Sequence, residues 1–218
     1  MLEYIREYLL IIPCVLIALT FHEFAHGYVA YKLGDPTAKY SGRLSMNPIK
    51  HLDPIGTICM IFFHFGWAKP VPVNTRYFKK PRRDMALTAA AGPIMNFLLA
   101  FVSLLIFYLL PFLFKLFPLT NFTVNLYMTA SDFFFYMHVL NLSLGVFNLI
   151  PLPPLDGSRI FLTFLPPKYY FGIMQYERII QVVFLLLLCT DIITLPLSHI
   201  VGWISSGMDY IINFIPFL

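Results

Sequence analysis

Two histidines and a glutamate lie at a spacing that suits metal chemistry, in the run His22-Glu23-Phe24-Ala25-His26. On a helix, side chains four residues apart lie about 40° apart around the axis and one turn along it, so both imidazoles can reach one metal ion. Glu23 is turned by about 100° from His22 and can approach a water molecule beside that ion. The pattern HExxH is typical of zinc metalloproteases, in which the glutamate is the general base.

A third metal ligand has to come from elsewhere, because a catalytic zinc site uses three protein ligands and leaves one position open. Asp156 is the best candidate, since three prolines break the chain before it and Gly157 allows a tight turn after it. In the alternative interpretation, Asp156 caps a helix that begins near Ser158. Glu177 is a rival ligand, although it adjoins Arg178 in a charged patch where a solvated role is sufficient.

Two asparagines lie in apolar stretches of the chain, Asn96 one turn after Gly92-Pro93 and Asn148 just before the prolines. Asn96 could hold a peptide carbonyl or an oxyanion, or it could simply link two helices, and its residue type leaves both roles open. Asn148 poses the same choice. The remaining histidines lack ligand spacing, and structural or interfacial roles are expected for them: His51, His64, His138 and His199.

The composition places these residues in a membrane. Of the 218 residues, 59% are hydrophobic and 12% are charged, and the mean hydropathy is +0.75. Soluble domains carry about 25% charged residues. Ionisable side chains inside an apolar helix are costly and mark function, so three of them within five residues call for a compensating cation. The cysteines have no CxxC spacing and predict small buried side chains rather than a metal cluster.

Spacing of the apolar stretches predicts an all-α polytopic membrane protein with about five spans, in a range of four to six. A single membrane-embedded domain, 1–218, is expected, with a catalytic core at about 5–165 and a C-terminal helical hairpin at about 173–217 that turns at Pro196. Residues 55–66 are apolar but too short to span, which favours a re-entrant piece, and the prolines of 70–73 predict an extended edge strand. The predicted spans are 5–31, 85–114, 128–150, 173–195 and 197–217.

Charge predicts the orientation of these spans. Ten of the 15 Lys and Arg residues lie between Lys32 and Arg83, and basic residues in short loops favour the cytoplasmic side. The four basic residues of the run 79–83 are also compatible with nucleic-acid binding. The run adjoins an apolar helix, however, and is better explained as a juxtamembrane anchor. No small-residue cleavage site follows the apolar run 9–21, which disfavours a signal peptide. We expect a multi-pass protein of the cell membrane whose active-site mouth faces the cytoplasm.

Taken together, these motifs resemble those of the site-2 protease family of intramembrane zinc metalloproteases. The HExxH at 22–26 and the segment from Asn148 to the Asp-Gly at 156–157 are similar to the hallmarks of that family. Gly92 to Asn96 resembles its GPxxN element. The runs 42–48 and 70–74 agree as well. The resemblance covers about residues 10–165 and is to compact bacterial members without PDZ or CBS domains.

The resemblance implies that His22, His26 and Asp156 bind one zinc ion, that Glu23 is the general base, and that Asn96 contacts the substrate or transition state. It implies substrates with a transmembrane helix, a lipid bilayer as surroundings, and no nucleic acid. We hypothesise that the 70–74 stretch grips an unwound substrate by strand addition.

Two other classes of function remain open, an intramembrane metal transporter or channel and an inactive scaffold that binds client helices. Glu23 separates the first of them from a protease, because a transporter needs no non-ligand carboxylate beside its metal.

Overall fold

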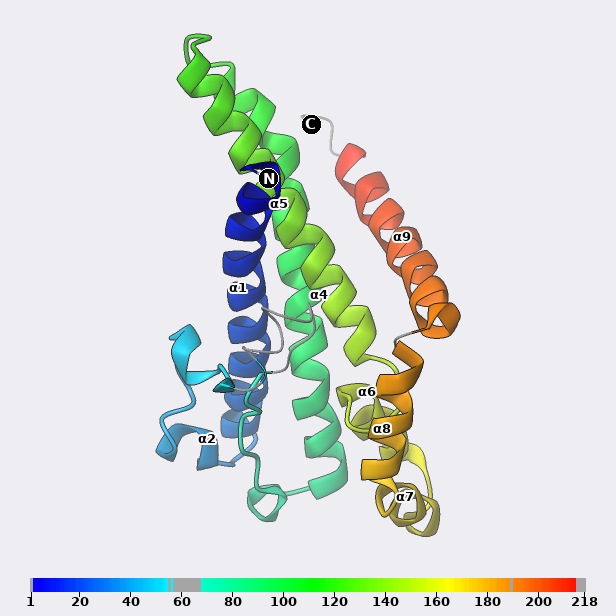
Figure 1. Cartoon of the computed structure of the whole chain (residues 1–218). Coiled ribbons are helices and arrows are strands. Elements are labelled where there is room, and N and C mark those ends of the chain that lie inside the picture. Colours follow the sequence, from blue (N-terminus) through cyan, green and yellow to red (C-terminus); the bar gives the residue numbers. More distant parts are fainter. Residues whose placement is uncertain (1, 55, 57–67, 189, 215–218) are drawn as a thin grey trace.

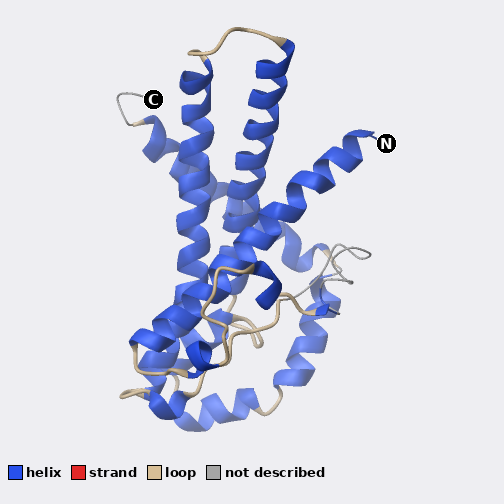
Figure 2. Ribbon diagram, turned by 90° about the vertical axis from the view of Figure 1, so that its left-hand side faces the viewer, coloured by secondary structure: helices blue, strands red, loops and turns tan. Residues whose placement is uncertain are grey.

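A computed structural model describes residues 2–54, 56, 68–188 and 190–214 of the chain. Within these residues the protein is built of helices, with no strand assigned (Figure 1, Figure 2), which confirms the all-α class. The elements are α1 (Leu2–Lys32), α2 (Thr37–Tyr40), η1 (Pro48–Lys50), η2 (Thr75–Tyr77), α4 (Pro81–Phe114), α5 (Asn121–Asn148), α6 (Asp156–Phe161), η3 (Leu162–Phe164), α7 (Pro167–Met174), α8 (Glu177–Leu188) and α9 (Asp191–Asn213).

Helices α1, α4 and α5 pack against one another and form the body of the molecule (Figure 1). The start of α4 carries Pro81 in its first turn, where a missing N–H is tolerated. A capping box starts α5, because Thr120 accepts from the backbone of Thr123 and the Thr123 hydroxyl accepts in return. These two signals mark the starts of α4 and α5, and the chain reverses direction between the end of α4 at Phe114 and Thr120.

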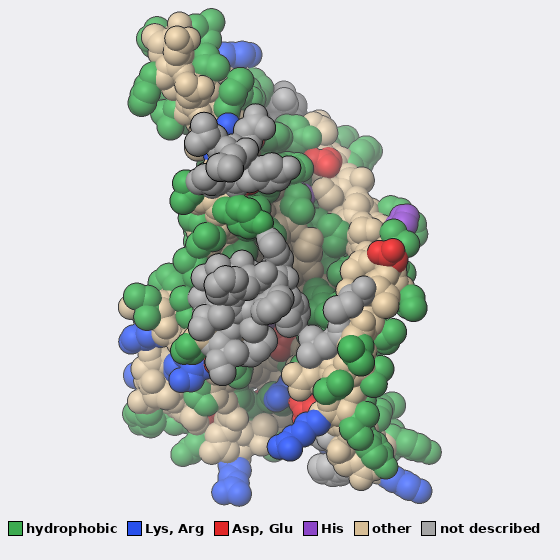
Figure 3. All heavy atoms as spheres, in the orientation of Figure 1, with side chains coloured by type: hydrophobic (Ala, Val, Ile, Leu, Met, Phe, Trp, Pro, Cys, Tyr) green, Lys and Arg blue, Asp and Glu red, His purple; other side chains and the backbone are tan. Residues whose placement is uncertain are grey.

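Membrane-spanning character is clearest in α1 and α4. From Arg6 to Lys32 and from Pro81 to Phe114, these helices are long and apolar enough to cross a bilayer, and α8 with α9 adds a third span if the bent pair is counted as one. The protein is therefore a membrane protein, but the expected count of five spans is not confirmed. Basic side chains are concentrated toward the end of the molecule where α1 finishes and α4 starts (Figure 3).

The C-terminal hairpin expected to turn at Pro196 is not found. Pro196 lies inside α9, and the chain bends instead by 78° between α8 and α9. With 12 residues α8 is only about 18 Å long, too short to cross a bilayer alone. The prediction failed because α9 accommodates Pro196 as its sixth residue: the proline removes the one hydrogen bond that an N–H at this position would donate to the carbonyl of Ile192, and the helix continues past it.

The connection between α1 and α4 is largely irregular. The predicted re-entrant piece at 55–66 lies outside the described residues, apart from Gly56. The predicted edge strand at 70–73 is absent from the described part of the chain, where the pairing of Leu52 with Ala68 is a single isolated bridge. Prolines at 70 and 72 explain this, because neither has an N–H to donate to a ladder.

Buried polar contacts hold this connection against the end of α1. The guanidinium of Arg43 donates to the carbonyls of Lys69 and Pro70. Asp35 is fully buried; one carboxylate oxygen accepts from the backbone and hydroxyl of Thr37, and the other accepts from the backbone N–H of Asn74 at 2.6 Å. Asp35 therefore fixes the stretch that leads into α4.

Replacing Asp35 with alanine should lower the free energy of unfolding by about 1–3 kcal/mol, because the partly buried N–H groups of Thr37 and Asn74 lose their acceptor. Denaturant unfolding of the purified protein in detergent micelles measures the change. The matched control is Asp132→Ala, which removes an ion pair with Arg6 whose two side chains are about half exposed and should cost at most about 1 kcal/mol. Equal losses in both variants would contradict the role given to Asp35.

Candidate metal centre and active site

Three side chains that the sequence singled out meet at one point between α1 and α6. His22 Nε2 and His26 Nε2 lie 3.0 Å apart, and each is 3.1 Å from Asp156 Oδ2. Among the described residues, this is the group of histidine and acidic side chains that could hold a metal ion. The two imidazoles come from successive turns of α1, as the HExxH spacing predicts.

Hydrogen bonds on the far side of each ring determine which nitrogen carries the proton. His26 Nδ1 donates to the backbone carbonyl of Thr88 at 2.7 Å, and His22 Nδ1 donates to Asn96 Oδ1 at 2.5 Å. A neutral imidazole carries one N–H. Both Nε2 atoms are therefore left as lone pairs that point at each other and at a carboxylate oxygen.

These three acceptor atoms fit a zinc ion. Ligands about 2.0 Å from a tetrahedral zinc lie roughly 3.3 Å from one another, close to the 3.0–3.1 Å separations found here. No hydrogen-bond donor reaches Asp156 Oδ2 from the described residues. Three buried acceptors at such distances repel one another unless a cation compensates them.

Asp156 is the first residue of α6, and Leu155 holds the cap position without any side-chain capping bond. The alternative in which Asp156 caps a helix starting near Ser158 is therefore not what the fold displays. The Oδ2 of Asp156 faces the Nε2 atoms of both imidazoles, so three acceptor atoms converge on one point.

Glu23 lies beside this cluster and lines a cavity of about 430 Å³ together with His22 and His26. Its Oε2 accepts a hydrogen bond from the backbone N–H of Val71 at 2.8 Å. The irregular 68–73 stretch thus forms one wall of the cavity and holds the carboxylate in place. Residues of α4 and the 148–159 region complete the lining.

The other predicted residues are dispersed. Asn148 ends α5, lines the cavity, and donates to the carbonyl of Leu144. Glu177 begins α8 and is outside the metal-binding group. Asn96 is fully buried behind His22 and is not among the described residues that line the cavity. Its interpretation as a substrate contact stays a prediction.

The additional histidines also fall into structural positions where they are described. His138 is buried between the carbonyl of Ala100 and the hydroxyl of Ser205, and His51 Nε2 donates to the carbonyl of Ser45. His199 is on α9, where its Nδ1 donates to the carbonyl of Leu195. His64 lies outside the described residues.

Sequence reasoning missed several residues of the site. Thr88 and Val71 act through backbone atoms, so no side-chain pattern could reveal them. Arg159 lines the cavity, and its position three residues after Asp156, one turn along α6, was the available signal. Asn141 was not missed: it lies on the same predicted span as His138, where a structural role was expected, and it contacts Asn96 across helices.

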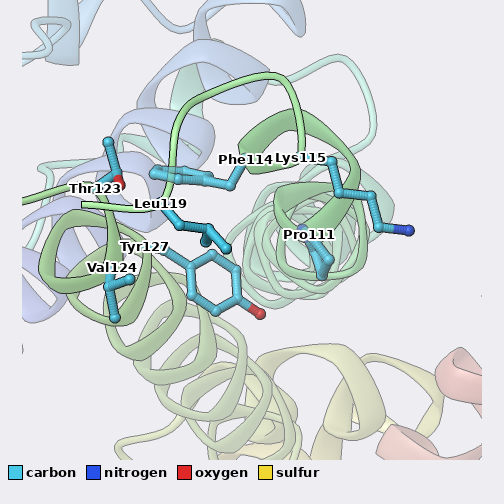
Figure 4. A pocket seen from close by; sticks show the side chains of 7 residues that line it. All are labelled: Pro111, Phe114, Lys115, Leu119, Thr123, Val124 and Tyr127. Carbon is cyan, nitrogen blue, oxygen red and sulfur yellow. The ribbon is translucent and has the colours of Figure 1, made fainter. Parts of the chain in front are cut away.

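A second cavity lies at the opposite end of the α4–α5 hairpin and differs in character (Figure 4). Its lining is mainly apolar and comes from the end of α4 and the start of α5, with Lys115 at its edge. Among the side chains labelled there, none belongs to the His22 cluster. The chemistry of the described residues is therefore concentrated in the cavity beside Glu23.

Comparison with known proteins identifies the family to which the chain belongs. The model of Peptidase family M50 matches residues 10–190. A Bacillus subtilis protein named "Putative zinc metalloprotease YwhC" is 45% identical over 203 residues, which are 91% of this chain and 87% of that relative. "Putative zinc metalloprotease Rip2" of Mycolicibacterium smegmatis is 26% identical and covers 97% of this chain and 80% of its own length.

A more distant relative is "Zinc metalloprotease MJ0392" of Methanocaldococcus jannaschii, 28% identical over 70% of this chain and 33% of its own length. No solved structure matches significantly. The family match and the YwhC relative confirm the resemblance to the site-2 proteases and the expected zinc cofactor. This chain belongs to Peptidase family M50 and is an intramembrane zinc metalloprotease.

Proposed function

We propose that the chain cleaves peptide bonds in or near the transmembrane segments of membrane-protein substrates, at one zinc ion held by His22, His26 and Asp156. The observation that carries this proposal is the triangle of acceptor atoms 3.0–3.1 Å apart, with the protons of both imidazoles turned away from it. Zinc bound there would supply a Lewis acid that polarises the scissile carbonyl and water.

Glu23, the non-ligand acid of the HExxH motif, is the proposed general base. Its carboxylate removes a proton from the attacking water, whose oxygen adds to the carbonyl carbon. The carboxyl then delivers the proton to the leaving amide nitrogen as the C–N bond breaks. The bond from the Val71 N–H supports this role because it keeps the carboxylate at the cavity wall.

The 68–73 stretch is the proposed contact for an unwound substrate. In the proposed complex the 71–73 backbone is extended, and because N–H groups two residues apart in a strand point to the same side, the Val73 N–H then faces the side on which Val71 meets Glu23. No described residue accepts from Val73, whereas prolines at 70 and 72 remove donors from the other side. A substrate strand can thus pair along the active-site side alone.

The proposed topology keeps the sequence-based orientation and counts α5 among the spans. With 28 residues, α5 is about 42 Å long, and it packs along α4 and α1. The basic 32–83 segment then lies in the cytoplasm with the mouth of the cavity. We propose a multi-pass protein of the cell membrane in which 1–218 forms one proteolytic domain. Helix α5 joins α1, α4 and the α8–α9 pair as a span, which gives four spans among the described residues, the lower end of the expected range of four to six.

Replacing Glu23 with glutamine should leave zinc bound and lower kcat/KM by about 10²- to 10⁴-fold, because the amide cannot accept the proton of water. Metal analysis of the purified protein and cleavage of a membrane-helix substrate in detergent measure both quantities. Glu177→Gln is the matched control and should retain zinc and activity. Cleavage that survives in Glu23→Gln contradicts the proposal, and zinc transport that depends on His22 without any cleavage would favour a transporter instead.

Replacing Val73 with proline should reduce cleavage by about tenfold or more while zinc content stays unchanged, because a substrate strand loses its donor. Val73→Ala, which trims the side chain but keeps the N–H, is the matched control and should remain active. If both variants cleave equally well, strand pairing at this position is wrong.

Gly92 generates a separate prediction, because a side chain there would collide with both imidazoles of the cluster. A Cβ at this position would overlap His26 Nε2 and would lie 2.5 Å from His22 Cε1 and 2.6 Å from His22 Nε2. Gly92→Ala should therefore displace the imidazoles and weaken zinc binding by about tenfold or more, which chelator competition measures. Gly202→Ala adds the same methyl group within a helix where nothing lies within 4 Å and should bind zinc normally. Undiminished affinity in Gly92→Ala would contradict a metal site formed by these two imidazoles against α4.

A further inference from the structure

Behind His22, two buried amides form a chain that joins α1, α4 and α5. His22 Nδ1 donates to Asn96 Oδ1 at 2.5 Å, and Asn96 Nδ2 donates to Asn141 Oδ1 at 2.9 Å. Neither asparagine side chain is exposed to solvent. Asn96 also donates to the carbonyl of Ala18 at 3.3 Å, and Asn141 donates to the carbonyl of Met137 at 2.8 Å.

Two backbone carbonyls fix the direction of this chain. A carbonyl only accepts, so the Met137 carbonyl requires the NH₂ of Asn141 and turns its oxygen toward Asn96. That oxygen and the Ala18 carbonyl both require the NH₂ of Asn96. The amide oxygen of Asn96 is then the atom left for His22.

The direction matters because the amide could otherwise face His22 with its NH₂ group. His22 Nδ1 would then be the acceptor, the ring proton would move to Nε2, and that nitrogen could no longer bind a metal. Groups that accept a hydrogen bond from the other ring nitrogen of a metal-binding histidine prevent this, because they fix the tautomer and orientation of the ring.

We propose that Asn141, acting through Asn96, is a positioning residue that holds His22 in the tautomer whose Nε2 is free to bind zinc. Asn96 is thereby assigned to the ring of His22 rather than to the substrate. This inference rests on the proposed function, in which His22 is a zinc ligand. It adds α5 to α1, α4 and α6 as an element that controls the metal site.

The contrast with His26 supports this assignment. The Nδ1 of His26 is fixed as a donor by the backbone carbonyl of Thr88, because a carbonyl can only accept a hydrogen bond. His22 depends on a side-chain amide, which can face the ring with either its oxygen or its NH₂ group. The second amide, that of Asn141, holds Asn96 with its oxygen toward His22. This explains why a pair of asparagines is buried among apolar helices.

Zinc affinity tests the proposal without relying on proteolysis. Dissociation constants for the full-length protein are measured by competition with a chromophoric chelator. Asn96→Leu should weaken binding by about 10- to 100-fold, and Asn141→Leu should weaken it less, by about 3- to 10-fold. Asn96→Asp keeps an acceptor for His22 but loses the donors to Asn141 and Ala18, so it should bind zinc less tightly than the wild type and more tightly than Asn96→Leu.

A spectroscopic readout separates positioning from loss of structure. With Co²⁺ in place of zinc, Asn96→Leu and Asn141→Leu should change the visible d–d absorption bands, whereas Asn96→Asp should leave them similar to the wild type. Ser205→Ala is the control, because it removes a hydrogen bond made by His138 on the same helix as Asn141 and should alter neither affinity nor spectrum.

The outcomes separate the proposed zinc ligands from the proposed positioning role of Asn96 and Asn141. If His22→Ala binds zinc as tightly as the wild type, the proposed ligand set is wrong. If His22→Ala loses zinc but Asn96→Leu and Asn141→Leu retain wild-type affinity and spectrum, the ligand set stands and the positioning chain is overturned. Unchanged affinity with a raised KM in Asn96→Leu would restore Asn96 as a substrate contact. Equal losses in Asn96→Asp and Asn96→Leu would overturn the acceptor argument.

Discussion

Two imidazole lone pairs and a carboxylate oxygen converge in a region that is otherwise mainly apolar, and their mutual repulsion is the constraint on which the site depends. Each atom lies 3.0–3.1 Å from the other two, and charged or polar atoms buried in this way are costly unless they are compensated. A divalent cation satisfies all three at once, and the zinc metalloprotease names of the relatives agree with that requirement.

The arrangement of the helices follows from the need to keep this cluster together. Helix α1 supplies both imidazoles, and α4 lies close enough to hydrogen-bond each of them from behind. That closeness is possible because Gly92 has no side chain; a Cβ there would overlap the His22 ring. At α6, Gly157 plays a similar part, since a Cβ at that position would collide with the carbonyls of Leu149 and Ile150. Both glycines serve close approach rather than an unusual backbone conformation.

The long connection between α1 and α4 has a different relation to the site. It contributes backbone atoms and few side chains, and the Val71 N–H that meets Glu23 is the clearest case. Its position is maintained by Asp35 and Arg43, which are buried polar residues at some distance from the metal cluster. A loop without regular structure can therefore hold a catalytic wall when charged side chains tie its backbone down.

The class of protein and most of the metal cluster could be inferred without the structure. Apolar stretches near 20 residues predicted membrane helices, and the spacing of His22 and His26 placed two imidazoles on one face of α1, because helical periodicity is a local property. The predicted spans 85–114 and 128–150 overlap α4 and α5, but both helices begin earlier, at Pro81 and Asn121. Partners from distant parts of the chain depended on the tertiary fold: the amide pair Asn96 and Asn141, the carbonyl of Thr88 and the N–H of Val71. Backbone donors and acceptors are the same in nearly every residue, so their use at a site leaves no trace in residue type. The bend between α8 and α9 could not be predicted either, since a proline can lie in a turn or within a helix and packing decides which.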